Sequence, residues 1–173
     1  MIFLLSGKRG VGKDYIADHL VSQYNFIKLS LAEQVKLDYC KLNGVDYSEM
    51  LNRDKKENHR KKIIELAEGK KKQDLHYWCK ILQTVITENI DKHVVICDIR
   101  YQEELDYFTE NNLNIYFIRI NCSEKERKKR GIIINNVDED TSETYFDNYN
   151  FEYVFESDEN ILISISNFIN INI

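Results

Sequence analysis

The stretch Gly7-Lys8-Arg9-Gly10-Val11-Gly12-Lys13-Asp14 decides the fold. It directly follows the apolar run 2–5 and opens the amphipathic segment 13–24, which is the strand–loop–helix context that the GxxxxGK phosphate loop requires. Glycines let the backbone curl into a ring of N–H donors, and the helix N-terminus adds partial positive charge behind a bound anion. We therefore predict that residues 7–14 bind nucleotide phosphates and that Lys13 reaches the β- and γ-phosphates. A glycine turn without a nucleotide is the alternative.

Asp14 stands at the position where this loop usually carries Ser or Thr, whose hydroxyl binds Mg²⁺. A carboxylate can hold Mg²⁺ directly or through water. We therefore expect ATP and Mg²⁺ as cofactors, with Asp14 as one metal ligand.

Strand and helix patterns alternate along the rest of the chain, which is typical of a parallel sheet covered on both faces. The fold class is therefore predicted to be α/β. The predicted strands are residues 2–5, 26–29, 94–97, 114–120 and 153–156. The predicted helices are residues 13–24, 31–42, 54–72, 75–89, 102–111, 123–130 and 158–169.

A second group of candidate residues follows the apolar strand 94–97, which ends in Asp98 and Arg100. Ligands of open parallel sheets lie beyond the carboxyl ends of the strands, so Asp98 is expected beside the phosphate loop. Asp98 could bind Mg²⁺ or accept a proton from the substrate. Arg100 could hold a substrate phosphate in a bidentate fork. A purely structural Asp–Arg pair is the alternative.

Arg127 and Arg130 lie three residues apart on the predicted helix 123–130 and so share one face of it. Together with Arg9, such arginines could close over ATP and neutralise charge during phosphoryl transfer. Gly131 is typical of a helix stop or hinge, which suits a movable lid. A solvated basic helix is the alternative.

Further candidates concern the acceptor substrate. Lys36 and Arg60 lie on helices that would cover the substrate, and we expect them to bind its phosphate. The acidic run 138–143 contains Ser142 and Glu143, which could contact the substrate or the lid. A solvated face is the alternative for each.

Composition excludes several classes of protein. The net charge of −5 argues against a nonspecific nucleic-acid binder. No apolar run approaches the roughly 20 residues that cross a bilayer, and the apolar run 2–5 is too short for a signal peptide. We expect a cytoplasmic protein with a small phosphorylated substrate, without nucleic-acid or membrane partners. The sequence leaves the oligomeric state open.

These motifs resemble two related families of P-loop kinases, namely the deoxynucleoside monophosphate kinases of phages and large DNA viruses and the animal-type phosphomevalonate kinases. The quoted matches are residues 6–14, Leu31-Ala32 with Lys36, Asp98-Ile99-Arg100 with Glu103, and Ser142-Glu143. The resemblance implies one P-loop NTPase domain of the nucleoside-monophosphate-kinase type over residues 1–173. It places acceptor-binding helices at about 31–90 and a small lid at about 123–143.

The two families imply different acceptors. Arg130-Gly131 and Val137-Asp138-Glu139 resemble the phosphomevalonate kinases, but Tyr101 stands where that family usually has a second arginine. Asp98-Ile99-Arg100-Tyr101 is closer to the DxR-aromatic pattern of the nucleotide kinases. We therefore expect ATP-dependent transfer to a (deoxy)nucleoside monophosphate, giving the diphosphate. A phosphomevalonate kinase and a non-catalytic nucleotide-binding module are the alternatives.

The expected mechanism needs no strong base, because the attacking oxygen of an acceptor phosphate is already anionic. Arg100, Lys36 and Arg60 would hold the acceptor for an in-line attack on the γ-phosphorus. Catalysis would come from positioning and charge neutralisation, and lid closure would exclude water. The expected catalytic residues are Lys13, Arg9, Asp98, Arg127 and Arg130.

Overall fold

The computed structural model describes residues 1–172, with the side chains of all but residue 53. The chain divides into two compact units. The sheet unit contains residues 1–28 and the described part of 90–173, and the helical unit contains residues 29–89. Among the described residues, no helix is both long enough and apolar enough to span a bilayer.

The sheet unit is built on five parallel strands in the order β2-β3-β1-β4-β5. The strands are β1 (Ile2–Ser6), β2 (Phe26–Leu29), β3 (His93–Ile96), β4 (Ile115–Asn121) and β5 (Tyr153–Glu156). Central β1 is buried along its whole length, with Leu4 in register with Ile96 on one side and Phe117 on the other. This continuous burial explains the uninterrupted apolar run, because both faces of the strand are covered.

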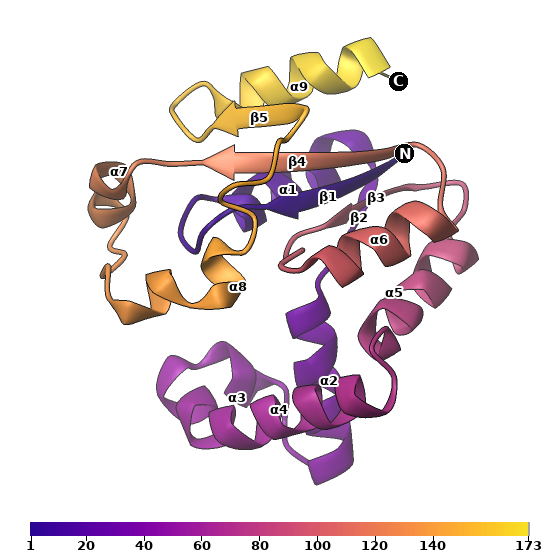
Figure 1. The fold of residues 1–173 in the computed structure, drawn as a ribbon, viewed down its shortest axis with the longest axis vertical. Helices are drawn as coiled ribbons and strands as arrows, with labels where there is room; N and C mark the ends of the chain where they lie inside the picture. The colour runs from indigo at the N-terminus through magenta and orange to yellow at the C-terminus, as the bar shows by residue number, and fades with distance from the viewer. Residues whose placement is uncertain (173) are drawn as a thin grey trace. The chain divides into compact units, whose positions relative to one another are not determined.

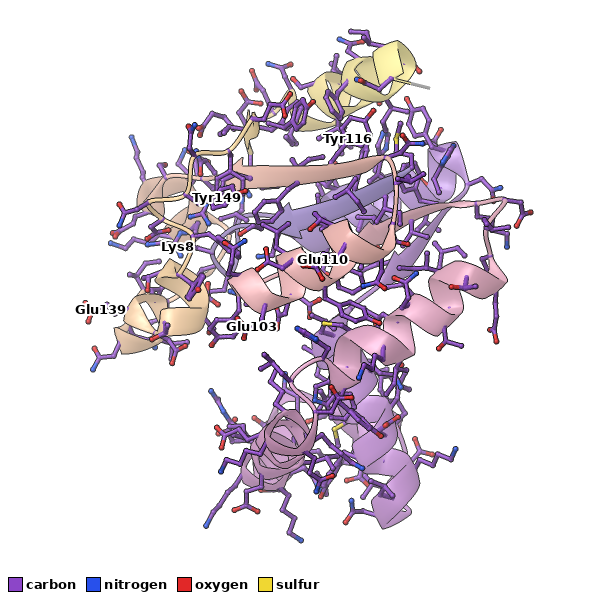
Figure 2. All side chains as sticks on the ribbon, turned by 45° about the vertical axis from the view of Figure 1, so that its right-hand side comes forward. Lys8, Glu103, Glu110, Tyr116, Glu139 and Tyr149 are labelled. Carbon is purple, nitrogen blue, oxygen red and sulfur yellow. The ribbon has the colours of Figure 1, made fainter. Side chains whose placement is uncertain are left out.

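Helices cover both faces of this sheet (Figure 1). Helices α1 (Lys13–Tyr24) and α9 (Ile161–Asn172) pack against one face, and α6 (Gln102–Asn111) lies on the other. The face towards α1 and α9 carries one continuous core that includes Phe3, Ile16 and Ile165. Tyr116 extends this core, with its ring 5.5 Å from that of Phe168 on α9 (Figure 2).

Three short helices follow β4 near the carboxyl ends of the strands (Figure 1). They are α7 (Glu124–Lys129), the 3₁₀ helix η1 (Asn136–Glu139) and α8 (Thr141–Thr144). Ser123 caps α7 by accepting a hydrogen bond from the N–H of Glu126, and Gly131 ends the turn with a φ of 81°. The helix stop at Gly131 is therefore confirmed. Its use as a lid hinge stays a prediction.

The helical unit contains α2 (Leu31–Asn43), α3 (Ser48–Leu51), α4 (Arg53–Gln73) and α5 (Tyr77–Glu88). Tyr39, Cys40 and Met50 form a buried cluster within it. The indole N–H of Trp78 donates to the carbonyl of Ala67 at 3.2 Å and ties α5 to α4. The unit spans nearly the range expected for the acceptor-binding helices, and that role stays a prediction.

Candidate functional site

The phosphate loop connects β1 to α1 and lies against the end of β4. A Cβ added at Gly7 would lie 2.5 Å from the carbonyl oxygen of Ile120, and the φ of Gly7 is 148°. Only glycine fits here, because the neighbour is strand backbone and the dihedral angle is one that other residues rarely adopt. At the tip of the loop, a Cβ on Gly10 would lie 2.4 Å from the Ile132 side chain, so the segment after α7 packs directly on the loop.

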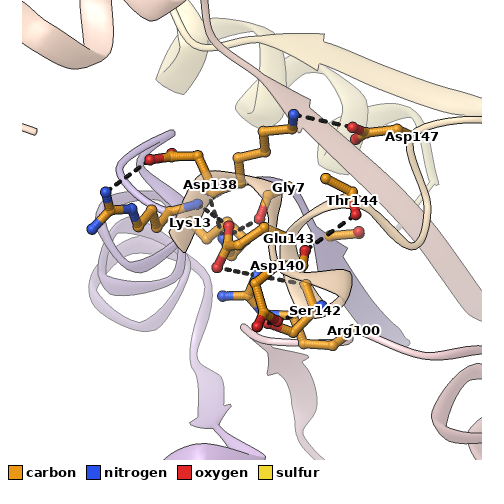
Figure 3. Close-up of polar contacts among 12 residues, drawn as sticks. Gly7, Lys13, Arg100, Asp138, Asp140, Ser142, Glu143, Thr144 and Asp147 are labelled. Carbon is orange, nitrogen blue, oxygen red and sulfur yellow. Dashed lines mark hydrogen bonds and ion pairs between the residues drawn. The ribbon is translucent and has the colours of Figure 1, made fainter. Parts of the chain in front are cut away.

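Lys13 is buried and its ammonium group lies inside the loop. Nζ donates to the carbonyl oxygens of Gly7 and Lys8 (Figure 3). Burial, followed by the positive charge of Arg100, lowers the pKa of Lys13 to about 8, while Glu143 and Asp98 oppose this shift. The predicted residues Lys13, Arg100, Glu143 and Asp98 therefore lie within electrostatic range of one another.

Arg9 and Arg127 are brought together by a buried carboxylate. Asp138 Oδ2 accepts from Arg9 at 2.8 Å and Oδ1 accepts from Arg127 at 2.6 Å. The hydrogen bond from Arg9, the N–H of Asn135 and the hydrogen bond from Arg127 hold the pKa of the Asp138 carboxyl well below its usual range. The Nε atoms of both arginines are buried without a hydrogen-bond partner among residues 1–172.

Arg100 is fixed at the turn between β3 and α6. Its backbone N–H donates to the buried carboxylate of Glu104 at 2.8 Å. Its guanidinium donates to Glu143 Oε1 at 2.6 Å and to the carbonyl of Ser142 at 3.0 Å (Figure 3). The other oxygen of Glu143 accepts the backbone N–H of Arg9 at 2.6 Å. Glu143 thus joins the phosphate loop to the arginine that we expect to bind the acceptor.

Two further basic groups share Asp147. Its Oδ2 lies 3.0 Å from Lys8 Nζ and its Oδ1 lies 2.5 Å from the guanidinium of Arg119 on β4. Lys8, Arg119 and Arg127 line a cavity of about 400 Å³ beside the phosphate loop, together with Val11. A second cavity of about 370 Å³ is lined by residues of α6 and β4 rather than by the loop.

Arg130 spans the other side of the loop. Its guanidinium donates to the carbonyl of Val11 at 3.2 Å and to the hydroxyl of Ser157 at 3.0 Å, after β5. A Cβ on Gly12 would lie 3.2 Å from the same hydroxyl. The Arg130 side chain therefore connects the phosphate loop to the residue that follows β5.

The carboxylates that we expect to hold Mg²⁺ are those of Asp14 and Asp98. Asp14 is exposed and its Oδ1 lies 2.9 Å from Lys28 Nζ. Both carboxylates lie near the buried Cys97, where burial and then Asp98 raise the pKa of the thiol, with a further contribution from Asp14. No group of three or more metal-binding side chains exists among residues 1–172. Because Mg²⁺ on a nucleotide usually takes one or two carboxylates besides phosphates and waters, this pair fits the ion.

The two remaining acceptor candidates belong to the helical unit. Lys36 is half-buried on α2. Arg60 is exposed on α4 and pairs with Glu57 at 3.3 Å. Their contact with a substrate phosphate stays a prediction.

Three polar residues of the site were missed from the sequence as functional candidates: Asp147, Arg119 and Ser157. Asp138 was noted as part of the acidic run 138–143 and of a family pattern, without a role of its own. One available signal is the absence of Lys and Arg after residue 130, which leaves the acids of the last 43 residues to pair with bases from earlier in the chain.

Comparisons with known proteins place this geometry in a family. The family model for phosphomevalonate kinase matches residues 5–114, which covers the phosphate loop, Asp98 and Arg100. The phosphomevalonate kinase of Drosophila melanogaster is 24% identical over 169 residues, covering 92% of this chain and 89% of that protein.

Similar solved structures support the fold. The shikimate kinase of Aquifex aeolicus is 13% identical with a TM-score of 0.54, covering 99% of this chain and 98% of that one. A sugar kinase from Janibacter is 12% identical with a TM-score of 0.55, covering 98% and 94%. The fold is thus that of the P-loop kinases, as expected. The nucleoside monophosphate interpretation is not confirmed. On the family match and the phosphate loop, this chain is a kinase that belongs to the phosphomevalonate kinase family.

Proposed function

We propose that the protein transfers the γ-phosphoryl group of ATP to phosphomevalonate, giving ADP and diphosphomevalonate. The observation that carries the proposal is the family match over residues 5–114, which includes both the loop and Arg100. The name of the Drosophila relative supports the same acceptor. Tyr101 favoured a nucleotide acceptor in the sequence analysis. It is a single position, and the match to the phosphomevalonate kinase family over residues 5–114 outweighs it.

The donor side of the proposal rests on the phosphate loop. Its backbone N–H groups and the N-terminus of α1 would hold the ATP phosphates, and Lys13 would contact the β/γ oxygens. Mg²⁺, when bound, would neutralise phosphate charge, and Asp14 and Asp98 are the residues that would hold it. The cavity beside Lys8 and Val11 offers room for further parts of the nucleotide.

The acceptor side rests on Arg100, whose planar guanidinium suits the phosphate of a phosphomonoester. We propose that Lys36 and Arg60 add positive charge for the same group. An acceptor phosphate oxygen attacks in line without prior deprotonation, so Asp98 would orient groups rather than act as an obligatory base.

Arg9, Arg127 and Arg130 would stabilise the charge of the transferring phosphoryl group. Arg9 and Arg127 share Asp138, and the guanidinium groups of Arg127 and Arg130 donate to loop carbonyls, so these arginines are already held in place beside the loop. Groups placed in advance stabilise a transition state without reorganisation at the moment of reaction. Loss of one such arginine typically lowers kcat by about 10³-fold or more.

The test is ADP release from ATP and Mg²⁺ with phosphomevalonate, compared with dAMP, dGMP, dCMP and dTMP. We expect turnover with phosphomevalonate alone. Turnover restricted to a nucleotide would reject the proposed acceptor, and ATP binding without turnover on any acceptor would indicate a non-catalytic module. Lys13→Ala should abolish most turnover while leaving the far-UV circular dichroism unchanged.

A further inference from the structure

Several basic residues around the phosphate loop are paired with carboxylates of one acidic segment, residues 135–147. Asp138 binds Arg9 and Arg127, Glu143 binds Arg100 and the phosphate loop, and Asp147 binds Lys8 and Arg119. Figure 3 shows Asp138 and Glu143 near Lys13 and Gly7, with Asp147 further to one side. Among the described residues, Glu143 is the one of these three carboxylates that accepts a hydrogen bond from a backbone N–H of the loop.

Glu143 makes the contacts expected of a bound phosphate. Its two oxygens accept from the N–H of Arg9 and from the guanidinium of Arg100, each at 2.6 Å. Its negative charge also acts on Lys13. The side chain is only 6% exposed, so this carboxylate fills the junction between the loop and Arg100.

The short helix α8 holds Glu143 in this position. Asp140 caps the helix by accepting the N–H of Ser142 at 2.8 Å, and the N–H of Glu143 donates to the carbonyl of Asp140. The ring of Tyr145 packs against Tyr101, with 5.4 Å between the ring centroids. These contacts connect the position of Glu143 to α8 and to the Tyr101–Tyr145 ring pair.

A phosphate at the same junction would compete with Glu143 for the same donors. Two anions sharing one N–H and one guanidinium repel each other, and burial strengthens this repulsion. We propose that Glu143 is an internal anion that fills the phosphate junction of the free protein and is displaced, together with α8, by the terminal phosphate of ATP. This inference rests on the proposed function only for the identity of the incoming ligand.

The test compares Glu143→Gln with Glu139→Gln. Glutamine keeps the size of the side chain and removes the charge. Glu139 is an exposed acid of the same segment that lies at its outer edge (Figure 2), so it serves as the matched control. Calorimetric titration with ATP should show about tenfold tighter binding to Glu143→Gln, within the usual range of coupling between sites. Binding to Glu139→Gln should match the wild type.

Titration with ADP provides a second comparison, because ADP lacks the terminal phosphate. We expect a smaller gain for ADP than for ATP in Glu143→Gln. Equal gains for both nucleotides, or ATP binding that is unchanged or weaker in this variant, would overturn the proposal.

Hydrogen exchange on the wild-type protein tests the displacement of Glu143 and α8 without any variant. It therefore remains a test of the proposal even if Glu143→Gln does not fold. A non-hydrolysable ATP analogue should increase amide exchange in residues 140–147. Unchanged or slower exchange there would reject the displacement. Failure of phosphomevalonate turnover would leave these binding results intact, so the proposed function and this inference can fail separately.

Discussion

At the scale of single residues, Lys13 links nucleotide binding to pH. Its ammonium group is buried and its pKa lies at about 8, below the ordinary value of 10.5. Bound phosphates favour the charged form, so binding is strongest where Lys13 is protonated. We expect ATP affinity to be constant below about pH 8 and to fall by up to about tenfold per pH unit above it.

Calorimetric titration between pH 7 and pH 10 measures this dependence. Lys13→Met, which cannot titrate at this position, is the control and should bind ATP weakly at every pH, without the step. A wild-type affinity that stays flat across this range would show that Lys13 remains protonated in the free protein.

Asp138 is the residue whose charge matters most for the stability of the site. It is 6% exposed and it holds two arginines through separate oxygens. Asp138→Asn leaves the two guanidinium charges facing each other, and removing one partner of a buried pair typically costs ~3 kcal/mol or more. We expect that loss in the free energy of unfolding by urea at pH 7.

The difference in the free energy of unfolding between the wild type and Asp138→Asn should also depend on pH. The folded protein lowers the pKa of Asp138 below the ordinary 3.8. Its contribution is therefore complete above that value and declines as the pH falls below it. The gap between wild type and Asp138→Asn should shrink towards pH 3, whereas Glu139→Gln should stay within about 0.5 kcal/mol of wild type at both pH values.

At the scale of elements, substitutions at two glycines distinguish the cost of backbone strain from the cost of a steric clash. Gly131 has a φ of 81° and open space around a would-be Cβ, whereas a Cβ added to Gly7 would lie 2.5 Å from the carbonyl oxygen of Ile120. We expect Gly131→Ala to cost about 1 kcal/mol from strain alone. Gly7→Ala should cost more and lose ATP binding, because β4 or the loop must move.

Thermal unfolding and ATP titration of the two variants measure these effects side by side. Equal stability of the two proteins, with ATP binding retained in Gly7→Ala, would mean that β4 yields to the added methyl group without cost.

The elements were largely predictable because their patterns are local. The apolar strands and amphipathic helices lie within a few residues of their predicted ends, and the differences have local causes. Helix α5 begins at Tyr77 rather than residue 75, since Asp74 accepts the N–H of His76 and forms a turn first. The four-residue helix α3 was not predicted, because one helical turn carries no periodic pattern.

The partners within the site could not be predicted in the same way. The hydrogen bond from Arg9 to Asp138 joins residues 129 positions apart, and that from Arg100 to Glu143 joins residues 43 apart. The sequence identifies the basic groups by their motifs, but only the folded sheet brings the acidic segment onto them. The contact of Ser142 and Glu143 with the substrate or the lid stays a prediction. In the folded chain both accept hydrogen bonds from Arg100, and Glu143 also accepts the N–H of Arg9.

At the scale of the whole molecule, helix α4 of the helical unit is less well covered than helix α1 of the sheet unit. In the sheet unit, Ile16, Ala17 and Leu20 of α1 are completely buried. In the helical unit, no described side chain of α4 is fully buried. Helices with few buried side chains open locally at a lower free energy than those in a core. We expect amides near the middle of α4 to be at least about tenfold less protected from hydrogen exchange than those of α1.

Exchange followed by mass spectrometry on the free protein makes this comparison within one sample, with α1 as the internal reference. Repeating the exchange with phosphomevalonate tests the role of Arg60, because Arg60 lies on α4 and we propose that it binds the acceptor phosphate. If so, protection of α4 should rise with phosphomevalonate and remain unchanged with an equal concentration of inorganic sulfate at the same ionic strength. Equal protection of α1 and α4 in the free protein would contradict the expectation drawn from their burial. If phosphomevalonate left the protection of α4 unchanged, Arg60 would not belong to the proposed acceptor site.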